Sequence, residues 1–290
     1  MDYEKLKNAT SIISHLFSFL VIELPTDPLW DDDWDDRQPP STGNEEVDRE
    51  RDRAIRHHGV TRHIILIRHG QYDETHREDH RRTLTELGKK QAHLTGQRLV
   101  ALLKGVDDPK FTPIRVVAMH VSDLTRAKET AAIIESYMPE EIRLSPPDAN
   151  LNEGRPAHNI PGGQARPSVV AKTDECHSRI ETAFQRYFYR SDKQLVVPHE
   201  ADNPQESSSP PPQELHEFEI IVGHANVIRY FVCRALQLPP EAWLRLCIFN
   251  CSLTYLTIRP TGTVSCRMIG DIGHLPYDHE TFSMHYGFNW

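Results

Sequence analysis

The stretch ILIRHG at residues 65–70 joins a run of aliphatic residues to an arginine, a histidine and a glycine. A second run, IIVGHA at residues 220–225, also leads directly into a histidine. Short continuous apolar runs are typical of strands that are buried on both faces of a parallel sheet. Because the active site of an open α/β sheet lies at the carboxyl ends of its strands, we expect His69 and His224 to face one crevice.

Segments with strand and helix patterns alternate outward from these two runs. The sequence Thr83-Leu-Thr-Glu86 has the pattern of a capping box that opens a helix. Further strands are expected at 114–119, 252–259 and 263–269, and further helices at 122–138, 179–190 and 227–238. This alternation predicts an α/β fold: a three-layer αβα sandwich whose mostly parallel central sheet is covered by helices on both faces.

The composition limits the classes of function. A chain of 290 residues can hold one domain of about 200 residues together with appendages. Its net charge of -9 argues against nucleic-acid binding, which requires clustered lysine and arginine. The seventeen histidines show no metal-ligand spacing, so we expect no metal site. We interpret His57-His58 and the run 76–80 as solvated polar surface.

Three segments differ in composition from the alternating pattern. Residues 1–24 contain an apolar helical stripe at 11–24, shorter than the roughly 20 residues that cross a bilayer. We expect this stripe to bind a membrane, the alternative being a helix packed onto the folded domain. Residues 25–60 are rich in Pro, Asp, Glu and Arg, which predicts a disordered linker. Residues 191–217 are rich in Pro, Ser and Glu, which predicts a surface loop insertion.

Two tryptophans stand within the polar linker, in the sequence Trp30-Asp-Asp-Asp-Trp34-Asp35. A solvated acidic segment has no core of its own to bury these rings, so we expect them to dock on another surface. A neighbouring copy of the chain could supply that surface. A local turn that lays the rings on their own domain is an equal alternative.

Two arginines accompany the first histidine in a pattern that suits phosphoryl transfer. This reaction needs a nucleophile, positive charge around the phosphoryl oxygens and a proton donor for the leaving group. His69 offers a nucleophilic nitrogen, and Arg68 offers a guanidinium that can bind phosphate with two parallel hydrogen bonds. Arg126 is expected in the first turn of a helix that follows a strand, where it can reach an anion at the helix amino end.

Four motifs in this order resemble the phosphoglycerate-mutase-like histidine phosphatase superfamily. They are Arg68-His69-Gly70, Ser122-x-x-x-Arg126-Ala-x-Glu-Thr130, Leu151-x-Glu153-Gly154 and Gly223-His224. The resemblance covers about residues 61–275 and implies that residues 61–290 form a phosphoglycerate-mutase-like phosphatase domain. It implies hydrolysis of phosphomonoesters with neither metal nor other cofactor.

The resemblance also implies a role for each matching residue. His69 corresponds to the nucleophile that becomes phosphohistidine. Glu153 corresponds to the general acid that protonates the leaving oxygen and then deprotonates the attacking water. The phosphate-binding positions are Arg68, Arg126, His224 and Ala225.

A narrower resemblance is to the mitochondrial serine/threonine-protein phosphatases of this superfamily. It rests on residues 223–237, on Trp243-Leu244-Arg245 and on the upstream tryptophan motif. It implies phosphoprotein substrates, a homo-oligomer and a mitochondrial location, with the outer membrane as the expected one. It also implies that the hydrophobic segment at 1–24 anchors the chain in that membrane, with a short spanning helix as an alternative to a helix that only binds the surface. The multimerisation residues that it implies are Trp30, Asp31, Trp34 and Asp35.

Two other functions stay open from the sequence. The first is a small-molecule phosphatase or mutase. The family's mutases follow the Arg-His-Gly motif with a serine and a Trp-Asn pair, whereas Gln71-Tyr-Asp-Glu74 stands here, which disfavours mutase activity. The second is a multimeric scaffold or regulatory binding protein on a phosphatase fold. The presence of all the core catalytic positions disfavours that alternative.

Overall fold

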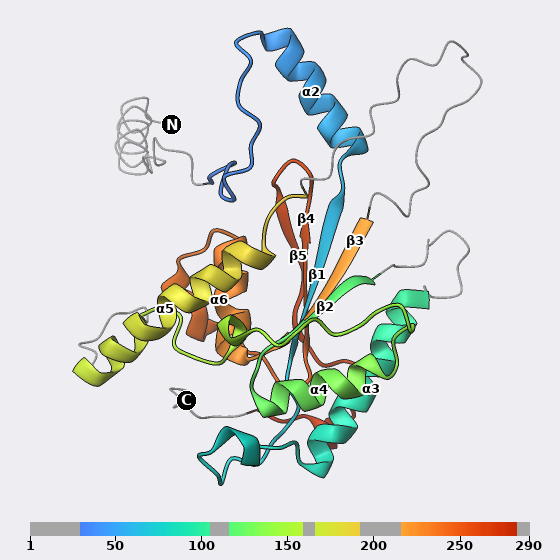
Figure 1. Ribbon diagram of the computed structural model, residues 1–290, viewed down its shortest axis with the longest axis vertical. Coiled ribbons are helices and arrows are strands. Elements are labelled where there is room, and N and C mark those ends of the chain that lie inside the picture. The colour runs from blue at the N-terminus through green and yellow to red at the C-terminus, as the bar shows by residue number, and fades with distance from the viewer. Residues whose placement is uncertain (1–29, 105–115, 159–165, 192–215, 283–290) are drawn as a thin grey trace, which may run out of the picture. The chain divides into compact units, whose positions relative to one another are not determined.

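The computed structural model describes residues 30–104, 116–158, 166–191 and 216–282, and its centre is a five-stranded sheet (Figure 1). The strands, in the spatial order β2-β3-β1-β4-β5, are Val116–Val121, His216–Gly223, Thr61–Arg68, Leu253–Ile258 and Val264–Asp271. Strands β1, β2 and β3 are parallel, and β4 and β5 are added antiparallel at the edge next to β1. The predicted α/β fold is confirmed, and its sheet is mixed, with two parallel and two antiparallel strand pairs.

Helices cover both faces of the sheet (Figure 1). Helices α3 (Glu86–Lys104) and α4 (Thr125–Glu135) lie on one face, and α5 (Pro167–Tyr187) and α6 (Ala225–Ala235) lie on the other. Alternate residues of β1 divide between the two cores: Ile64 and Leu66 pack with α5 and α6, while Ile65 and Ile67 pack with α4. This period-two alternation in a strand that is apolar on both sides produces the three layers. Short 3-10 helices occupy Asp79–Arg81, Ala149–Leu151, Pro240–Arg245 and Tyr277–His279.

Helix α3 begins two residues later than the capping box predicts. The hydroxyl of Thr85, not that of Thr83, accepts a hydrogen bond from the backbone N–H of Gly88, at 3.0 Å. The carbonyl of Thr83 instead accepts from the backbone N–H of Asp73, at 2.8 Å. Thr83 therefore belongs to the loop that precedes the helix, and Thr85 caps it.

Two other segments differ from their predicted limits. Helix α5 begins at Pro167, well before the expected start at 179. Strand β3 begins at His216, so the last two residues of the predicted loop insertion belong to the sheet. The rest of that insertion, 192–215, lies outside the described residues.

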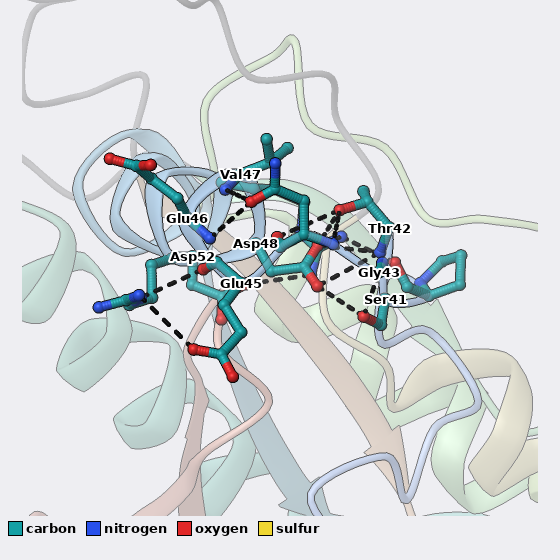
Figure 2. A network of polar contacts seen from close by, with 12 residues as sticks. Ser41, Thr42, Gly43, Glu45, Glu46, Val47, Asp48 and Asp52 are labelled. Carbon is teal, nitrogen blue, oxygen red and sulfur yellow. Dashed lines mark hydrogen bonds and ion pairs between the residues drawn. The ribbon is translucent and has the colours of Figure 1, made fainter.

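Residues 45–58, which the composition places in a disordered linker, form helix α2 (Glu45–His58). None of its residues is buried, so local capping rather than core packing accounts for this helix. The side chain of Asn44 accepts from the backbone N–H of Glu46 at 3.0 Å. Figure 2 shows the carboxylate of Asp48 turned back to accept from the hydroxyls of Ser41 and Thr42, at 2.6 and 2.9 Å. These bonds, together with acidic residues in the first turn and basic residues in the last, favour a helix in a polar sequence.

The chain divides into two compact units, Met1–Asp31 and Asp32–Trp290. The apolar stripe at 11–24 lies outside the described residues. In the part of the chain that is described, no helix has the length and apolar content that a membrane span requires.

The second half of the tryptophan motif docks on its own domain. The indole Nε1 of Trp34 donates to the carbonyl of Gly262 at 2.8 Å, and its ring lies 6.0 Å from that of Phe184. The carboxylate of Asp35 is almost fully buried and accepts from the backbone N–H and the Nε of Arg190, at 2.6 and 2.8 Å. Trp34 and Asp35 therefore lie on their own domain, which is the intramolecular alternative, and are not free to dock on another molecule in this structure.

Candidate active site

The residues that directly follow the three parallel strands lie together at the carboxyl ends of those strands. His69 follows β1, His224 follows β3 and Ser122 follows β2. The backbone N–H of His69 donates to the carbonyl of Gly223 at 3.0 Å, which continues the ladder one residue past the strands. The imidazole rings of His69 and His224 consequently lie with their centroids 5.1 Å apart, and both are buried. The predicted convergence of the two histidines is confirmed.

The contacts of His69 define its tautomer. Its Nδ1 lies 2.8 Å from the carbonyl oxygen of Gly70, which can only accept, so Nδ1 carries the proton. Its Nε2 accepts from the Nε of Arg126 at 3.2 Å and therefore holds a lone pair. Burial lowers the pKa of His69 well below the ordinary histidine value, and the positive charges of Arg126 and Arg68 lower it further. His69 is therefore a neutral imidazole with its lone pair on Nε2, the form that a nucleophilic histidine requires.

Two buried guanidinium groups flank this nitrogen. Arg68 and Arg126 are each only 4% exposed. The Nη1 of Arg68 donates to the carbonyl of Ile248 at 2.7 Å, and burial lowers the pKa of this arginine to about 10. Among the described residues, the Nε of Arg68 and the Nη1 of Arg126 have no hydrogen-bond partner. Unsatisfied buried donors are costly, so this pair forms a site that favours an anion.

The tautomer of His224 is also defined by its neighbours. The backbone N–H of Asp123 donates to Oδ1 of Asn152 at 3.0 Å, and the hydroxyl of Ser122 donates to the same oxygen at 2.8 Å. The hydroxyl of Ser122 therefore accepts from Nε2 of His224, at 2.7 Å. Burial and Arg126 lower the pKa of His224, so its Nδ1 holds a lone pair. This Nδ1 is buried without a partner in the described residues and can take up a proton when an anion enters.

Glu153 supplies the carboxyl group of the site. Its Oε1 accepts from the backbone N–H of Gly154 at 3.1 Å. Burial raises the pKa of Glu153 above that of a free glutamate, against the opposing positive charges of Arg126 and Arg68. A carboxyl group with a raised pKa beside two guanidinium groups is suited to donate a proton to a leaving group.

Tyr72 and Asp79 form one wall of the site, and the sequence did not predict it. The ring of Tyr72 meets that of His69 edge-on at 5.1 Å, and the guanidinium of Arg126 lies over the Tyr72 ring at 4.7 Å. The hydroxyl of Tyr72 accepts from Arg82 at 2.9 Å. Asp79 lies in the same loop, and its carboxylate bonds to Thr125 at the start of α4.

The interpretation of 76–80 as solvated polar surface is thus wrong for Asp79. The run of charged and histidine residues there carried no signal for this contact, because Asp79 meets α4 only through the fold. In the sequence, Tyr72 stands out only as a departure from the mutase pattern. Its place directly after the Arg-His-Gly motif was the one available signal.

The remaining sequence-predicted position, Ala225, is buried as the first residue of α6, next to His224. Asn250 was not predicted. It donates from Nδ2 to the carbonyl of His69 at 3.0 Å, and so holds the backbone of the candidate nucleophile from the β4 side. The candidate residues Trp30 and Asp31 belong to the other compact unit, Met1–Asp31.

Comparison with known proteins agrees with this geometry. A model of the histidine phosphatase superfamily (branch 1) matches residues 64–155 and 212–269. The mitochondrial serine/threonine-protein phosphatase PGAM5 of Xenopus tropicalis is 42% identical over 85% of this chain and 81% of its own length. Its counterpart from Caenorhabditis elegans is 40% identical over 88% of this chain and 81% of its own length.

Among solved structures, a phosphoglycerate mutase from Plasmodium falciparum is 32% identical. The match covers 75% of this chain and 96% of the mutase, with a TM-score of 0.46. The family match includes the two strand-end histidines, both arginines and Glu153. The chain therefore belongs to the histidine phosphatase superfamily, branch 1.

Proposed function

We propose that this chain is a protein serine/threonine phosphatase that works through a phosphohistidine at Nε2 of His69. The observation that carries the proposal is the tautomer of His69, which turns an unprotonated nitrogen toward Arg126. The names of the relatives support phosphoserine and phosphothreonine residues of proteins as the substrate class.

The first half of the reaction transfers the phosphoryl group to the enzyme. Arg68, Arg126 and His224 hold the phosphate oxygens, with His224 protonated at Nδ1 when the dianion is bound. The lone pair of His69 Nε2 attacks phosphorus while the bond to the serine or threonine oxygen breaks. Glu153 gives its proton to that oxygen, so the protein alcohol leaves neutral.

The second half returns the enzyme to its starting state. The Glu153 carboxylate takes a proton from water as the water oxygen attacks phosphorus and the N–P bond breaks. Inorganic phosphate leaves, and His69 recovers its lone pair at Nε2. Throughout, the carbonyl of Gly70 holds the Nδ1 proton and stabilises the positive charge that the phosphorylated ring carries.

We further propose a mitochondrial location with attachment to a membrane, the outer membrane being the expected one. The relatives are named mitochondrial, which supports the compartment. The apolar stripe at 11–24 supports the attachment. Carbonate washing and liposome flotation of the full chain test it, and a fully soluble protein would contradict it.

Self-association through the tryptophan motif is also a proposal. Trp34 and Asp35 already contact their own domain, so we assign the intermolecular contact to Trp30, which is 55% exposed. A buried tryptophan at an interface can contribute about 2 kcal/mol or more. Trp30→Ala is expected to give smaller particles in light scattering and lower activity per chain at low concentration. Unchanged particle size would contradict the proposal.

The decisive experiment compares two substrates and two variants. Wild type should dephosphorylate a phosphothreonine peptide much faster than it turns over phosphoglycerates, and labelled peptide should leave label on His69 after a quench without acid. His69→Ala should lose the label and several orders of magnitude in rate. His93→Ala, the matched control at an exposed histidine, should keep both. Faster turnover of phosphoglycerates, or label on His224, would overturn the proposal.

A further inference from the structure

A second pocket lies at the opposite end of β1 from His69. It has a volume of about 680 Å³, and its lining includes Arg56, His57, His63, His216, Arg259 and Arg267. Strand β1 separates His63 from the active-site edge by about 20 Å, since a strand rises roughly 3.3 Å per residue. The remaining lining consists of four threonines, a glycine and a proline, and the lining contains no carboxylate. We call this the basic pocket.

The walls of the basic pocket are fixed by close packing. A side chain at Gly59 would collide with the ring of Pro260, so the end of α2 lies directly against the turn between β4 and β5. This contact brings Arg56, from the last turn of α2, to the same cavity as Arg259, from that turn. Within the described residues, no carboxylate forms an ion pair with either arginine or with Arg267.

Two sets of hydrogen bonds line the floor of the pocket. The Nε of Arg267, which can only donate, bonds to Oγ1 of Thr257 at 3.0 Å. The hydroxyl of Tyr255 lies 2.6 Å from Nδ1 of His63, and the Nε2 of His63 lies 2.8 Å from Nδ1 of His216.

The titration of the two imidazoles leaves the charge of the pocket to its arginines. Burial lowers the pKa of His63 to about 3, and burial with Arg267 also lowers the pKa of His216. Near neutral pH, neither ring therefore adds a positive charge to the three guanidinium groups.

We propose that the basic pocket binds a ligand that carries two or more adjacent phosphate groups. Three guanidinium groups line a cavity of ligand size in a protein whose net charge is -9. Guanidinium groups pair with phosphate through two parallel hydrogen bonds, and three of them exceed what one phosphate requires. The pocket is separate from the phosphate-binding residues of the active site and does not depend on the proposed reaction.

The test measures binding of inorganic tripolyphosphate by calorimetry to the full chain and to three variants. The double variant Arg259→Glu, Arg267→Glu should bind at least tenfold more weakly, while Arg126→Ala, which changes the active-site anion site, should keep the interaction. Arg143→Glu, an exposed arginine outside the pocket, is the control for charge. Turnover of para-nitrophenyl phosphate by the double variant should equal that of wild type, which shows that the variant is folded.

A second arm separates a free ligand from a lipid headgroup. Vesicles of phosphatidylcholine with and without phosphatidylinositol bisphosphate are floated with wild type and with the double variant. Extra flotation of wild type on the second kind of vesicle, lost in the double variant, assigns the site to the headgroup. Binding of tripolyphosphate without that difference assigns it to a soluble polyphosphate. Wild-type behaviour of the double variant in both arms, or loss of binding in Arg126→Ala alone, overturns the proposal.

Discussion

The carboxylate of Asp79 accepts two hydrogen bonds from Thr125, from its backbone N–H at 2.9 Å and from its hydroxyl at 2.8 Å. The other oxygen of Asp79 lies 3.6 Å from Nη1 of Arg126. Asp79 thus caps the first turn of α4 and fixes the start of the helix that presents Arg126 to His69.

We expect Asp79→Ala to lower kcat/KM by about tenfold or more, because losing charge-assisted bonds at a helix start costs about 1.5–3 kcal/mol. Asp79→Asn keeps an acceptor for Thr125 but removes the charge near Arg126. It should recover most of the activity if Asp79 acts by positioning. Steady-state kinetics on one peptide, with thermal melting of both variants, decide the matter. Wild-type kinetics in Asp79→Ala would contradict a positioning role.

Arg126→Lys should lower kcat by about a hundredfold although it keeps the positive charge. The Nε of Arg126 donates to His69 while its Nη1 stays available to the substrate, and a single ammonium group cannot occupy both places. The measurement is single-turnover kinetics with a phosphothreonine peptide. Arg143→Lys serves as the matched exchange at an exposed arginine. Retained wild-type turnover would show that the guanidinium fork is not needed.

Glu153→Gln should slow the phosphoserine peptide far more than para-nitrophenyl phosphate, because a phenolate leaves without a proton whereas a serine alkoxide does not. In wild type, the protonated fraction of Glu153 falls as pH rises through its raised pKa. Peptide turnover should therefore persist to a higher pH than an ordinary glutamate, with a pKa near 4.3, would allow. Equal losses on both substrates would indicate a structural role.

The free energy of unfolding should decrease as the pH falls below neutrality. His63, His69 and His224 all have pKa values below the ordinary histidine value of about 6.5. The unfolded chain therefore binds more protons below that pH, and stability that is fully present above it is lost as the pH falls toward the lowered values. Urea unfolding at pH 7.5 and pH 5 measures the change. His63→Gln should reduce it and the exposed His93→Gln should not.

Asp35→Asn should destabilise the domain by about 3 kcal/mol, because it removes the nearer and more deeply buried of the two carboxylates that pair with Arg190, and leaves only Asp33 at 3.6 Å. Asp36→Asn, one residue further along and exposed, is the control and should have little effect. Urea unfolding measures the free energy of unfolding of both variants. An equally small change in both variants would show that Asp35 does not anchor the segment.

The sequence was sufficient to predict the parts of the fold that depend on local apolar runs. Strands β1 and β3 were predictable because they are buried on both faces and end at His69 and His224. The antiparallel pairing of β4 next to β1 was not, since its register is set by neighbours far along the chain. In the same way, Tyr72 and Asn250 reach the site only through tertiary packing.

The predictions for residues 45–58 and for the cap of α3 were wrong for a different reason. The average composition of residues 25–60 is that of a disordered linker. Asn44 and the order of charges in 45–58 are local signals for a helix, and an average over the whole segment hides them. At α3, Thr83 and Thr85 are both suitable caps, and only the pairing of the Thr83 carbonyl with Asp73 distinguishes them.

The docking of Trp34 and Asp35 sets how far the phosphatase domain can travel from its attachment. A free chain over 25–60 could extend for about 120 Å, at roughly 3.5 Å per residue. Because the domain holds the chain from Asp32 onward, at most seven residues, 25–31, separate it from residue 24, and they cannot span more than about 25 Å. With residues 11–24 on a membrane, as proposed, the enzyme would work within a thin layer over that surface. Its choice among phosphoproteins would then depend on which of them enter that layer.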